Sequence, residues 1–292
     1  MHERFIVKPG EEFRLKDHNP SFTNDFGNEE EACEKLAADI KALSHYQEKL
    51  YAQQEYALLI ILQAMDAAGK DSTIKHVMSG VNPQGCDVRS FKSPSTEELK
   101  HDYLWRAAKV LPERGRIGIF NRSYYEEVIV VRVHPELIAA EHIPTITADE
   151  GLWKTRYEEI NDFERHLVNN GTIILKFFLN ISKEEQRARF LARLETPEKN
   201  WKFSGSDLKE RAFWDDYMKA FEKTLKHTST EHAPWYVIPS NHKWFARVAV
   251  ADVIVKSLKS LNLSYPKISE EELNRLEEAK RSLEAEANPR EK

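Results

Sequence analysis

Short apolar runs alternate along the chain with longer segments in which apolar residues recur every three or four positions. The runs occupy residues 58–62, 86–91, 116–120, 172–179 and 235–239. The first run carries no charge, which is typical of a strand covered on both faces in a parallel sheet. Strands that alternate with helices along the whole chain predict an α/β fold, with a parallel sheet, helices on both of its faces and right-handed crossovers.

The helical segments are predicted from their periodicity and from the polar residues that begin them. They cover residues 29–54, 70 onward, 95–110, 147–169, 182 onward, 207–227, 241–261 and 269 onward. Capping boxes, with Glu three positions after Ser or Thr, begin at Ser95, Thr147, Ser182 and Ser269. We expect an irregular surface arm over residues 1–28, one domain over 29–262, and a charged helix with a disordered tail over 263–292.

Composition narrows the functional classes. The chain has 292 residues, of which 41% are hydrophobic and 31% charged, and its formal net charge is −5. The acidic total argues against nucleic acid as a partner, and a polyanionic ligand would need a local cationic channel. Cys33 and Cys86 have no metal or redox spacing, the first residues lack a signal-peptide core, and no apolar run reaches membrane-spanning length. We therefore expect a soluble, cytoplasmic protein with no membrane partner.

The segment after the first apolar run has the residue types of a phosphate-binding loop. Residues 62–76 read L-Q-A-M-D-A-A-G-K-D-S-T-I-K-H, so a strand leads through small residues to a lysine and a helix. In such a loop, main-chain N–H groups and a helix N-terminus surround an anion, and Lys70 adds a positive charge. The phosphate-binding candidates are Ala67, Ala68, Gly69, Asp71 and Ser72.

The match to the P-loop pattern is incomplete. Ala64 stands at the first glycine position, and Asp71 follows Lys70 where a hydroxyl normally helps to hold Mg²⁺. The simpler interpretation is an ordinary strand-to-helix turn with a solvent-facing lysine. The strand–loop–helix context favours phosphate binding.

A second motif follows the third apolar run, at the carboxyl end of the predicted sheet, where parallel sheets bind ligands. Asn121 ends the strand, and Arg122 stands where a nucleotide kinase carries an arginine that binds phosphoryl oxygens bidentately. Alternatively, Asn121 caps a helix and Arg122 is a surface residue. Glu126 is either a Mg²⁺ ligand, directly or through water, or an ordinary acid in the first turn of a helix.

Further cations are candidates for the channel that a polyanion needs. Those near the same end of the sheet are Lys75, Arg89, Lys92 and Arg132. Residues 182–215 are predicted to form a helical lid, whose closure excludes water and brings arginines to the transferring phosphoryl group. The lid candidates are Arg187, Arg189, Arg193, Lys202 and Asp207. Each cation is also compatible with a solvated surface, and no histidine zinc spacing or Ser-His-Asp pattern points to other chemistry.

Taken in order, these motifs resemble those of the family-2 polyphosphate kinases. The matching stretches are L-Q-A-M-D-A-A-G-K-D-S-T-I-K at 62–75, V-N-P-Q-G at 81–85, S-F-K-x-P at 90–94, L-W-R at 104–106, G-I-F-N-R-S-Y-Y-E-E-V at 118–128 and W-K-F-S-x-x-D at 201–207. The family tolerates Ala at the first glycine position and Asp after the lysine. The resemblance implies a P-loop core like that of thymidylate kinase, with a helical lid.

The resemblance also implies Mg²⁺-dependent phosphoryl transfer between inorganic polyphosphate and a nucleotide, in the class that accepts both AMP and ADP. By matched position, Asp66 and Lys70 are the catalytic pair of the phosphate loop, and Asn121 and Arg122 belong to the second motif. Many relatives have Asp where this chain has Asn121. A neutral amide is a weaker Mg²⁺ ligand than a carboxylate. Asp66, with Glu126 as a second ligand, is therefore expected to contribute more to metal binding.

The remaining expectations concern cofactors and partners. We expect Mn²⁺ to substitute for Mg²⁺, guanine nucleotides to be secondary substrates, and the chain to form a homodimer or homotetramer. Two other functions stay open. One is a nucleoside or nucleotide kinase that uses ATP as donor, and the other is a non-catalytic module that binds polyphosphate or nucleic acid.

Overall fold

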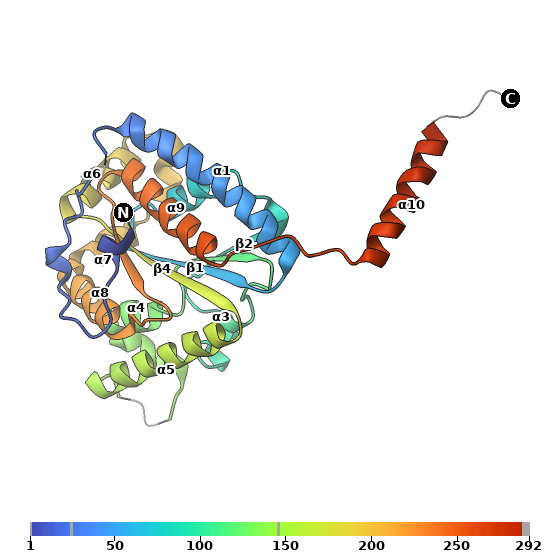
Figure 1. Cartoon of the computed structure of the whole chain (residues 1–292). Coiled ribbons are helices and arrows are strands. Elements are labelled where there is room, and N and C mark those ends of the chain that lie inside the picture. The colour runs from blue at the N-terminus through green and yellow to red at the C-terminus, as the bar shows by residue number, and fades with distance from the viewer. Residues whose placement is uncertain (1, 24–25, 145–146, 288–292) are drawn as a thin grey trace.

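A five-stranded parallel sheet forms the centre of the molecule (Figure 1). The computed structural model describes residues 2–23, 26–144 and 147–287. In spatial order the strands are β2 (Cys86–Ser90), β3 (Ile117–Asn121), β1 (Ala57–Gln63), β4 (Thr172–Asn180) and β5 (Trp235–Pro239). The predicted α/β fold with a parallel sheet is confirmed, and each strand lies within one residue of its apolar run.

β1 is the central strand, and its sequence suits that place. All seven of its residues are buried. Ile60 is paired with Ile119 of β3 on one side and with Leu175 of β4 on the other. A strand with neighbours on both sides and helices above and below buries both of its faces, which explains the continuous apolar run.

Helices cover both faces of the sheet (Figure 1). One face carries α1 (Glu29–Gln53), α2 (Lys70–Val77) and α9 (Lys243–Ser260). The other carries α4 (Glu126–Val133), α5 (Glu150–Asn169) and α8 (Trp214–Thr228). The chain between β4 and α8 forms α6 (Lys183–Leu194) and α7 (Gly205–Ala212). The shorter elements are α3 (Trp105–Ala108) and the 3₁₀ turns His2–Phe5, Leu15–Asp17, Pro83–Gly85, Glu98–Lys100, Pro135–Glu141 and Pro197–Lys202.

Two helix predictions are corrected by the structure. The Ser95 capping box forms, but residues 95–110 make only a 3₁₀ turn and α3, because the Asp102 carboxylate accepts from Leu104 N and starts a new turn. The predicted helix over 207–227 is divided at Phe213 into α7 and α8.

The start of α5 differs as well. Its N-cap is Asp149, whose carboxylate accepts from Leu152 N at 3.0 Å, and not Thr147. An Asp side chain one turn before the apolar stripe satisfies a free N–H of the first turn, which is the function of an N-cap.

The segments at the two ends of the chain behave differently. The first residues pack along β5, with Val7 N donating to Trp235 O at 2.8 Å and Ile6 forming an antiparallel bridge to Tyr236. α10 (Glu270–Ala287) stands away from the rest of the molecule (Figure 1). The predicted tail at residues 288–292 lies outside the described residues. Among the described residues, no helix combines the length and the apolar character that a membrane span requires.

Candidate active site

The loop between β1 and α2 has the backbone conformation of a tight anion-binding turn. Ala67 and Gly69 have positive φ values of 63° and 111°. Gly69 is the N-cap of α2, and its carbonyl accepts from Thr73 N at 2.9 Å. Only Gly adopts a φ of 111° without strain, whereas Ala at 63° is held at a cost by its surroundings. The helix N-terminus therefore opens onto the end of the central strand.

Lys70 turns back over this loop. Its Nζ donates to the carbonyl oxygen of Ala64 at 2.9 Å and contacts that of Met65 at 3.5 Å. Lys70 is only 9% exposed. Burial, followed by the positive charge of Arg122, lowers the pKa of Lys70 to about 8. The alternative of a solvent-facing lysine is therefore wrong, and the ammonium group stays within the loop that it would serve.

Arg122 connects this loop to the end of β3. Its Nη2 donates to Asp66 Oδ1 at 2.7 Å, and its Nη1 lies 3.9 Å from Glu126 Oε2. Burial opposes the charge on Arg122, but Glu126 and Asp66 outweigh it and raise the pKa of Arg122. Burial raises the pKa of Glu126, against the charges of Arg122 and Lys70. Two cations and two carboxylates thus face one another at the carboxyl end of the sheet.

Asn121 joins the same end of the sheet to α2. Its Nδ2 donates to Asp71 Oδ1 at 2.6 Å. Asn121 is the last residue of β3, and α4 begins five residues later with Tyr125 as its N-cap. The alternative that Asn121 caps a helix is therefore wrong. The side chain of Asp71, which follows Lys70, is thus oriented by the amide of Asn121 and not by a second carboxylate.

The oxygen ligands in this region suit a hard divalent cation that also binds the substrate. Among the described residues, no group of three or more His, Cys, Asp or Glu side chains is arranged to hold a metal ion. Mg²⁺ usually takes one or two protein carboxylates and completes its shell with water and phosphate oxygens. Asp66, Asp71 and Glu126 supply carboxylates of this kind, so the donor set fits a metal that arrives with phosphate.

Arg189, a candidate residue of the predicted lid, contacts the phosphate loop from behind, and its part in a lid stays a prediction. It is 7% exposed. Its acceptors are Glu185 and the carbonyl oxygens of Ala67, Ala68, Ser240 and Asn241. A guanidinium has five N–H donors, and all five are satisfied here. Arg189 therefore holds the phosphate loop from outside.

Ser72 and Arg132 are also engaged elsewhere. The Ser72 hydroxyl accepts from Arg247 of α9 at 2.8 Å, a contact that fixes it against that helix. Arg132 pairs with Glu150 at 2.5 Å, and its guanidinium lies 5.4 Å from the ring centroid of Trp153 on α5. Neither contact directs its side chain to the loop, and phosphate binding by Ser72 and Arg132 stays a prediction.

Four other predicted cations are exposed. They are Lys75 on α2, Arg89 on β2, Lys92 after β2 and Arg187 on α6. Arg193 is half-buried and lies 3.8 Å from Asp207 Oδ2. The side chain of Lys202 lies outside the described part of the structure.

The segment predicted as a lid reaches the site through α7. Burial, followed by the negative charge of Asp66, raises the pKa of Asp207 at the start of α7. Glu210 of the same helix accepts from Tyr217 Oη at 2.5 Å, and Nε2 of His134 lies 2.8 Å from the same oxygen. The sequence interpretation did not identify these contacts, and two of them, Asp66 with Asp207 and His134 with Glu210, join residues that are far apart in the chain. The sequence offered one signal for His134: it stands in the V-H-P sequence that directly follows the candidate Arg132.

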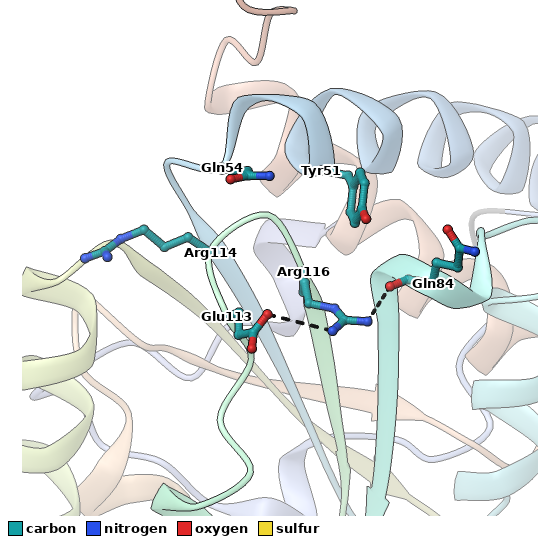
Figure 2. Close-up of a pocket in the computed structure, with 6 residues that line it drawn as sticks. All are labelled: Tyr51, Gln54, Gln84, Glu113, Arg114 and Arg116. Atoms are coloured by element: carbon teal, nitrogen blue, oxygen red, sulfur yellow. Dashed lines mark hydrogen bonds and ion pairs between the residues drawn. The ribbon is translucent and has the colours of Figure 1, made fainter.

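A cavity of about 330 Å³ lies at the opposite end of the sheet, where β3 begins (Figure 2). Its lining residues are Tyr51, Gln54, Gln84, Glu113, Arg114 and Arg116. Figure 2 shows Arg116 directed at the Gln84 carbonyl and at Glu113. Because the chain's own acceptors occupy this guanidinium, we assign the cavity no part in phosphate chemistry.

A parallel sheet with a phosphate loop after its central strand, and an arginine after the neighbouring strand, defines a P-loop kinase-like protein. The profile of the family described as polyphosphate kinase 2 (PPK2) matches residues 27–266. The chain belongs to this family, and the predicted family is confirmed.

Individual relatives agree over nearly the whole chain. The ADP-polyphosphate phosphotransferase of Rhodopseudomonas palustris is 52% identical over 265 residues, covering 90% of this chain and 92% of that protein. The AMP/ADP-polyphosphate phosphotransferase of Meiothermus ruber is 46% identical over 265 residues, covering 90% and 95%. The crystal structure of polyphosphate kinase 2 from Arthrobacter aurescens superposes with a TM-score of 0.87 at 42% identity, covering 97% of this chain and 96% of that one.

Proposed function

We propose that this protein transfers phosphoryl groups between inorganic polyphosphate and adenine nucleotides, making ADP from AMP and ATP from ADP in a reversible reaction. The observation that carries the proposal is that Lys70, whose Nζ donates to Ala64 O, and the ion pair of Arg122 with Asp66 lie together at the carboxyl end of β1. The names of two relatives that match nine-tenths of the chain support polyphosphate as donor and AMP or ADP as acceptor.

In this mechanism a phosphate oxygen of AMP or ADP attacks the terminal phosphorus of polyphosphate in line with the bond that breaks. The acceptor oxygen is already anionic near neutral pH, so the protein supplies no strong general base. The transition state of such a transfer is loose, and catalysis consists mainly of alignment and charge stabilisation. The loop amides of Ala67 and Gly69, together with Lys70, hold the donor phosphates, and Arg122 binds the transferring group.

A divalent cation completes the charge balance. When bound, Mg²⁺ would supply positive charge that offsets the negative charge developing between donor and acceptor. Asp66 would hold it, with Glu126 or Asp71 as the second carboxylate, since Asn121 supplies only an amide. Mn²⁺, which accepts the same oxygen ligands, is expected to replace it.

The exposed cations belong to the same proposal. Lys75, Arg89, Lys92 and Arg187 would form the channel for a long polyanion on a protein whose total charge is negative. Residues 182–215 would act as the lid, with Arg193 paired to Asp207 until phosphate arrives. Guanine nucleotides as secondary substrates, a homodimeric or homotetrameric assembly and a cytoplasmic location complete the proposal.

The direct experiment is a donor swap. The purified protein is incubated with ADP, Mg²⁺ and polyphosphate in the absence of ATP, and ATP is measured by luciferase. A parallel reaction with AMP is analysed by chromatography for ADP. ATP formation that disappears in Lys70→Met supports the proposal. A protein that phosphorylates nucleotides only when ATP is supplied is an ordinary kinase, and one that binds polyphosphate without turnover is a binding module, so either result overturns it.

A further inference from the structure

Three consecutive carbonyl groups of the phosphate loop are bound by side chains of α6. Gln186 Nε2 donates to Asp66 O at 3.0 Å. Arg189 Nη1 donates to Ala67 O at 3.0 Å and to Ala68 O at 2.8 Å. These contacts are buried, because Gln186 is 1% exposed and Arg189 is 7% exposed.

The contacts determine where the loop amides point. In a planar trans peptide the C=O of one residue and the N–H of the next point in opposite directions, and the described chain has no cis peptide bond. With the carbonyls of residues 66–68 facing α6, the N–H groups of residues 67–69 face away from it. Ala68 N donates to Met65 O at 3.3 Å within the loop, and the N–H groups of Ala67 and Gly69 are oriented as a bound phosphate requires. The strained φ of 63° at Ala67 is part of this arrangement and needs outside contacts to persist.

The orientation of the Gln186 amide is itself set by a second helix. Arg211 Nη1 donates to Gln186 Oε1 at 2.8 Å and to Lys183 O at 2.7 Å. A guanidinium can only donate, so Gln186 must turn its oxygen toward Arg211 and its Nε2 toward Asp66 O. Arg211 lies on α7, in the segment proposed as the lid. A continuous chain of contacts therefore runs from α7 through α6 to the phosphate loop.

We propose that Gln186 is a positioning residue that makes the geometry of the phosphate loop depend on the docking of α7. With α7 in place, Arg211 orients Gln186, and Gln186 holds the Asp66 carbonyl and directs the Ala67 N–H inward. When α7 moves, Gln186 loses the partner that selects its orientation, and the loop loses one of its outer contacts. This inference rests on the proposed phosphoryl transfer and adds to it a coupling between lid position and donor binding.

The experiment is a double-mutant cycle on the complete chain. Gln186→Met keeps the side-chain length and removes both hydrogen bonds, Arg211→Met removes the partner on α7, and Lys209→Met is the matched control on the exposed face of α7. Steady-state kinetics with polyphosphate and ADP give kcat and both KM values for each variant, and thermal melting gives the folded fraction.

Misplacement of a binding loop lowers kcat/KM for polyphosphate by about 10- to 100-fold in each single variant. KM for polyphosphate is expected to rise while KM for ADP stays within about threefold, because the loop binds the donor. A loss of folded protein would lower kcat and leave both KM values unchanged. Both residues act through one chain of contacts. The kcat/KM for polyphosphate of the double variant is therefore expected to lie within about threefold of that of the less active single variant.

Three results would overturn the proposal. They are losses that multiply in the double variant, a wild-type KM for polyphosphate in both single variants, and an equal loss in Lys209→Met. Should Gln186→Met fail to fold, Arg211→Met alone decides, since wild-type kcat/KM in that variant also excludes the relay. A wild-type protein that makes no ATP from polyphosphate and ADP refutes the proposed function instead, so the two failures are distinguishable.

Discussion

Arg122 Nη2 donates to Asp66 Oδ1 at 2.7 Å, and this contact joins the loops that follow β3 and β1. The pair is partly solvated, with side-chain exposures of 39% for Arg122 and 29% for Asp66. Partly solvated ion pairs add little stability, so this one serves the site more than the fold. Each partner has its own consequence for activity.

Arg122→Met is expected to lower kcat/KM by about 10²- to 10³-fold, the cost of removing one preorganised group that stabilises transition-state charge. The free energy of unfolding should change by less than about 1 kcal/mol, because the pair is partly solvated. A coupled ATP assay and urea unfolding measure the two effects. Arg165→Gln, an exposed pair partner on α5, is the control and should change neither. Equal activity of Arg122→Met and wild type would refute the role.

Asp66→Asn tests the carboxylate that would carry the metal. Exchanging a charged oxygen ligand for a neutral one should raise the Mg²⁺ concentration needed for half-maximal rate by about tenfold or more. Asp71→Asn and Glu126→Gln, titrated in the same way, identify the second carboxylate. Near-normal Mg²⁺ dependence and turnover in Asp66→Asn would exclude Asp66 as the main ligand.

The buried ammonium of Lys70 predicts a pH dependence. Burial lowers its pKa from 10.5 to about 8. Between these values the unfolded chain holds a proton that the folded protein has released, so this group makes the unfolding free energy rise with pH there. A bound polyanion favours the ammonium form, so tripolyphosphate binding at pH 9 should take up protons. Calorimetry in two buffers of different ionisation enthalpy measures this uptake, and the same uptake in Lys70→Met would contradict it.

Glu127 provides a pH dependence of opposite sign. Burial, followed by the charge of Glu141, raises the pKa of Glu127 from 4.5 to about 7. The folded protein keeps a proton in this window that the unfolded chain releases, so this group makes unfolding free energy fall as pH rises. Glu127→Gln carries no titratable proton. The unfolding free energy of Glu127→Gln minus that of wild type, measured by urea unfolding, should therefore increase between pH 5 and about 7.5. A difference that stays constant over this range would disprove the raised pKa.

The ion pair of Glu164 and Lys176 is fully buried, with both side chains 0% exposed. Tyr124 Oη and Tyr125 Oη donate to the same Glu164 oxygen, and Lys176 also donates to Thr228 O at 2.6 Å. Removing one partner leaves a buried charge, so Glu164→Leu should lower the unfolding free energy by about 3–5 kcal/mol. The double variant Glu164→Leu/Lys176→Met should recover part of this loss. A double variant that loses the sum of both single effects would show that the charges are not coupled.

The sequence predicted the parts of the site that are adjacent in the chain. Asp66 and Lys70 share one loop, and Asn121 and Arg122 directly follow a strand that pairs with β1. Parallel strands bring their carboxyl ends to one edge, so local motifs and strand order suffice to place these four residues together. The short α3 was not predicted, because a single side-chain hydrogen bond, from Leu104 N to Asp102, starts it. The break between α7 and α8 at Phe213 was not predicted either, and no side-chain cap marks it.

The arginines of residues 182–215 show the limit of this approach. Composition could not distinguish Arg187, which is exposed, from Arg189, which is buried under the phosphate loop. The helical spacing held one usable signal, since Gln186 and Arg189 are three residues apart on one face. Identifying that face as buried required knowledge of what α6 packs against.

The sequence by itself determined the sheet, the phosphate loop and the family, because apolar periodicity and contiguous motifs are written in neighbouring residues. Only the tertiary structure decided which cations face phosphate and which hold the loop from behind. That choice depends on backbone carbonyls such as Asp66 O, which every residue possesses and which no sequence pattern marks. Their partners, Gln186 and Arg189, lie more than a hundred residues away and meet them only when α6 packs beside the loop that follows β1.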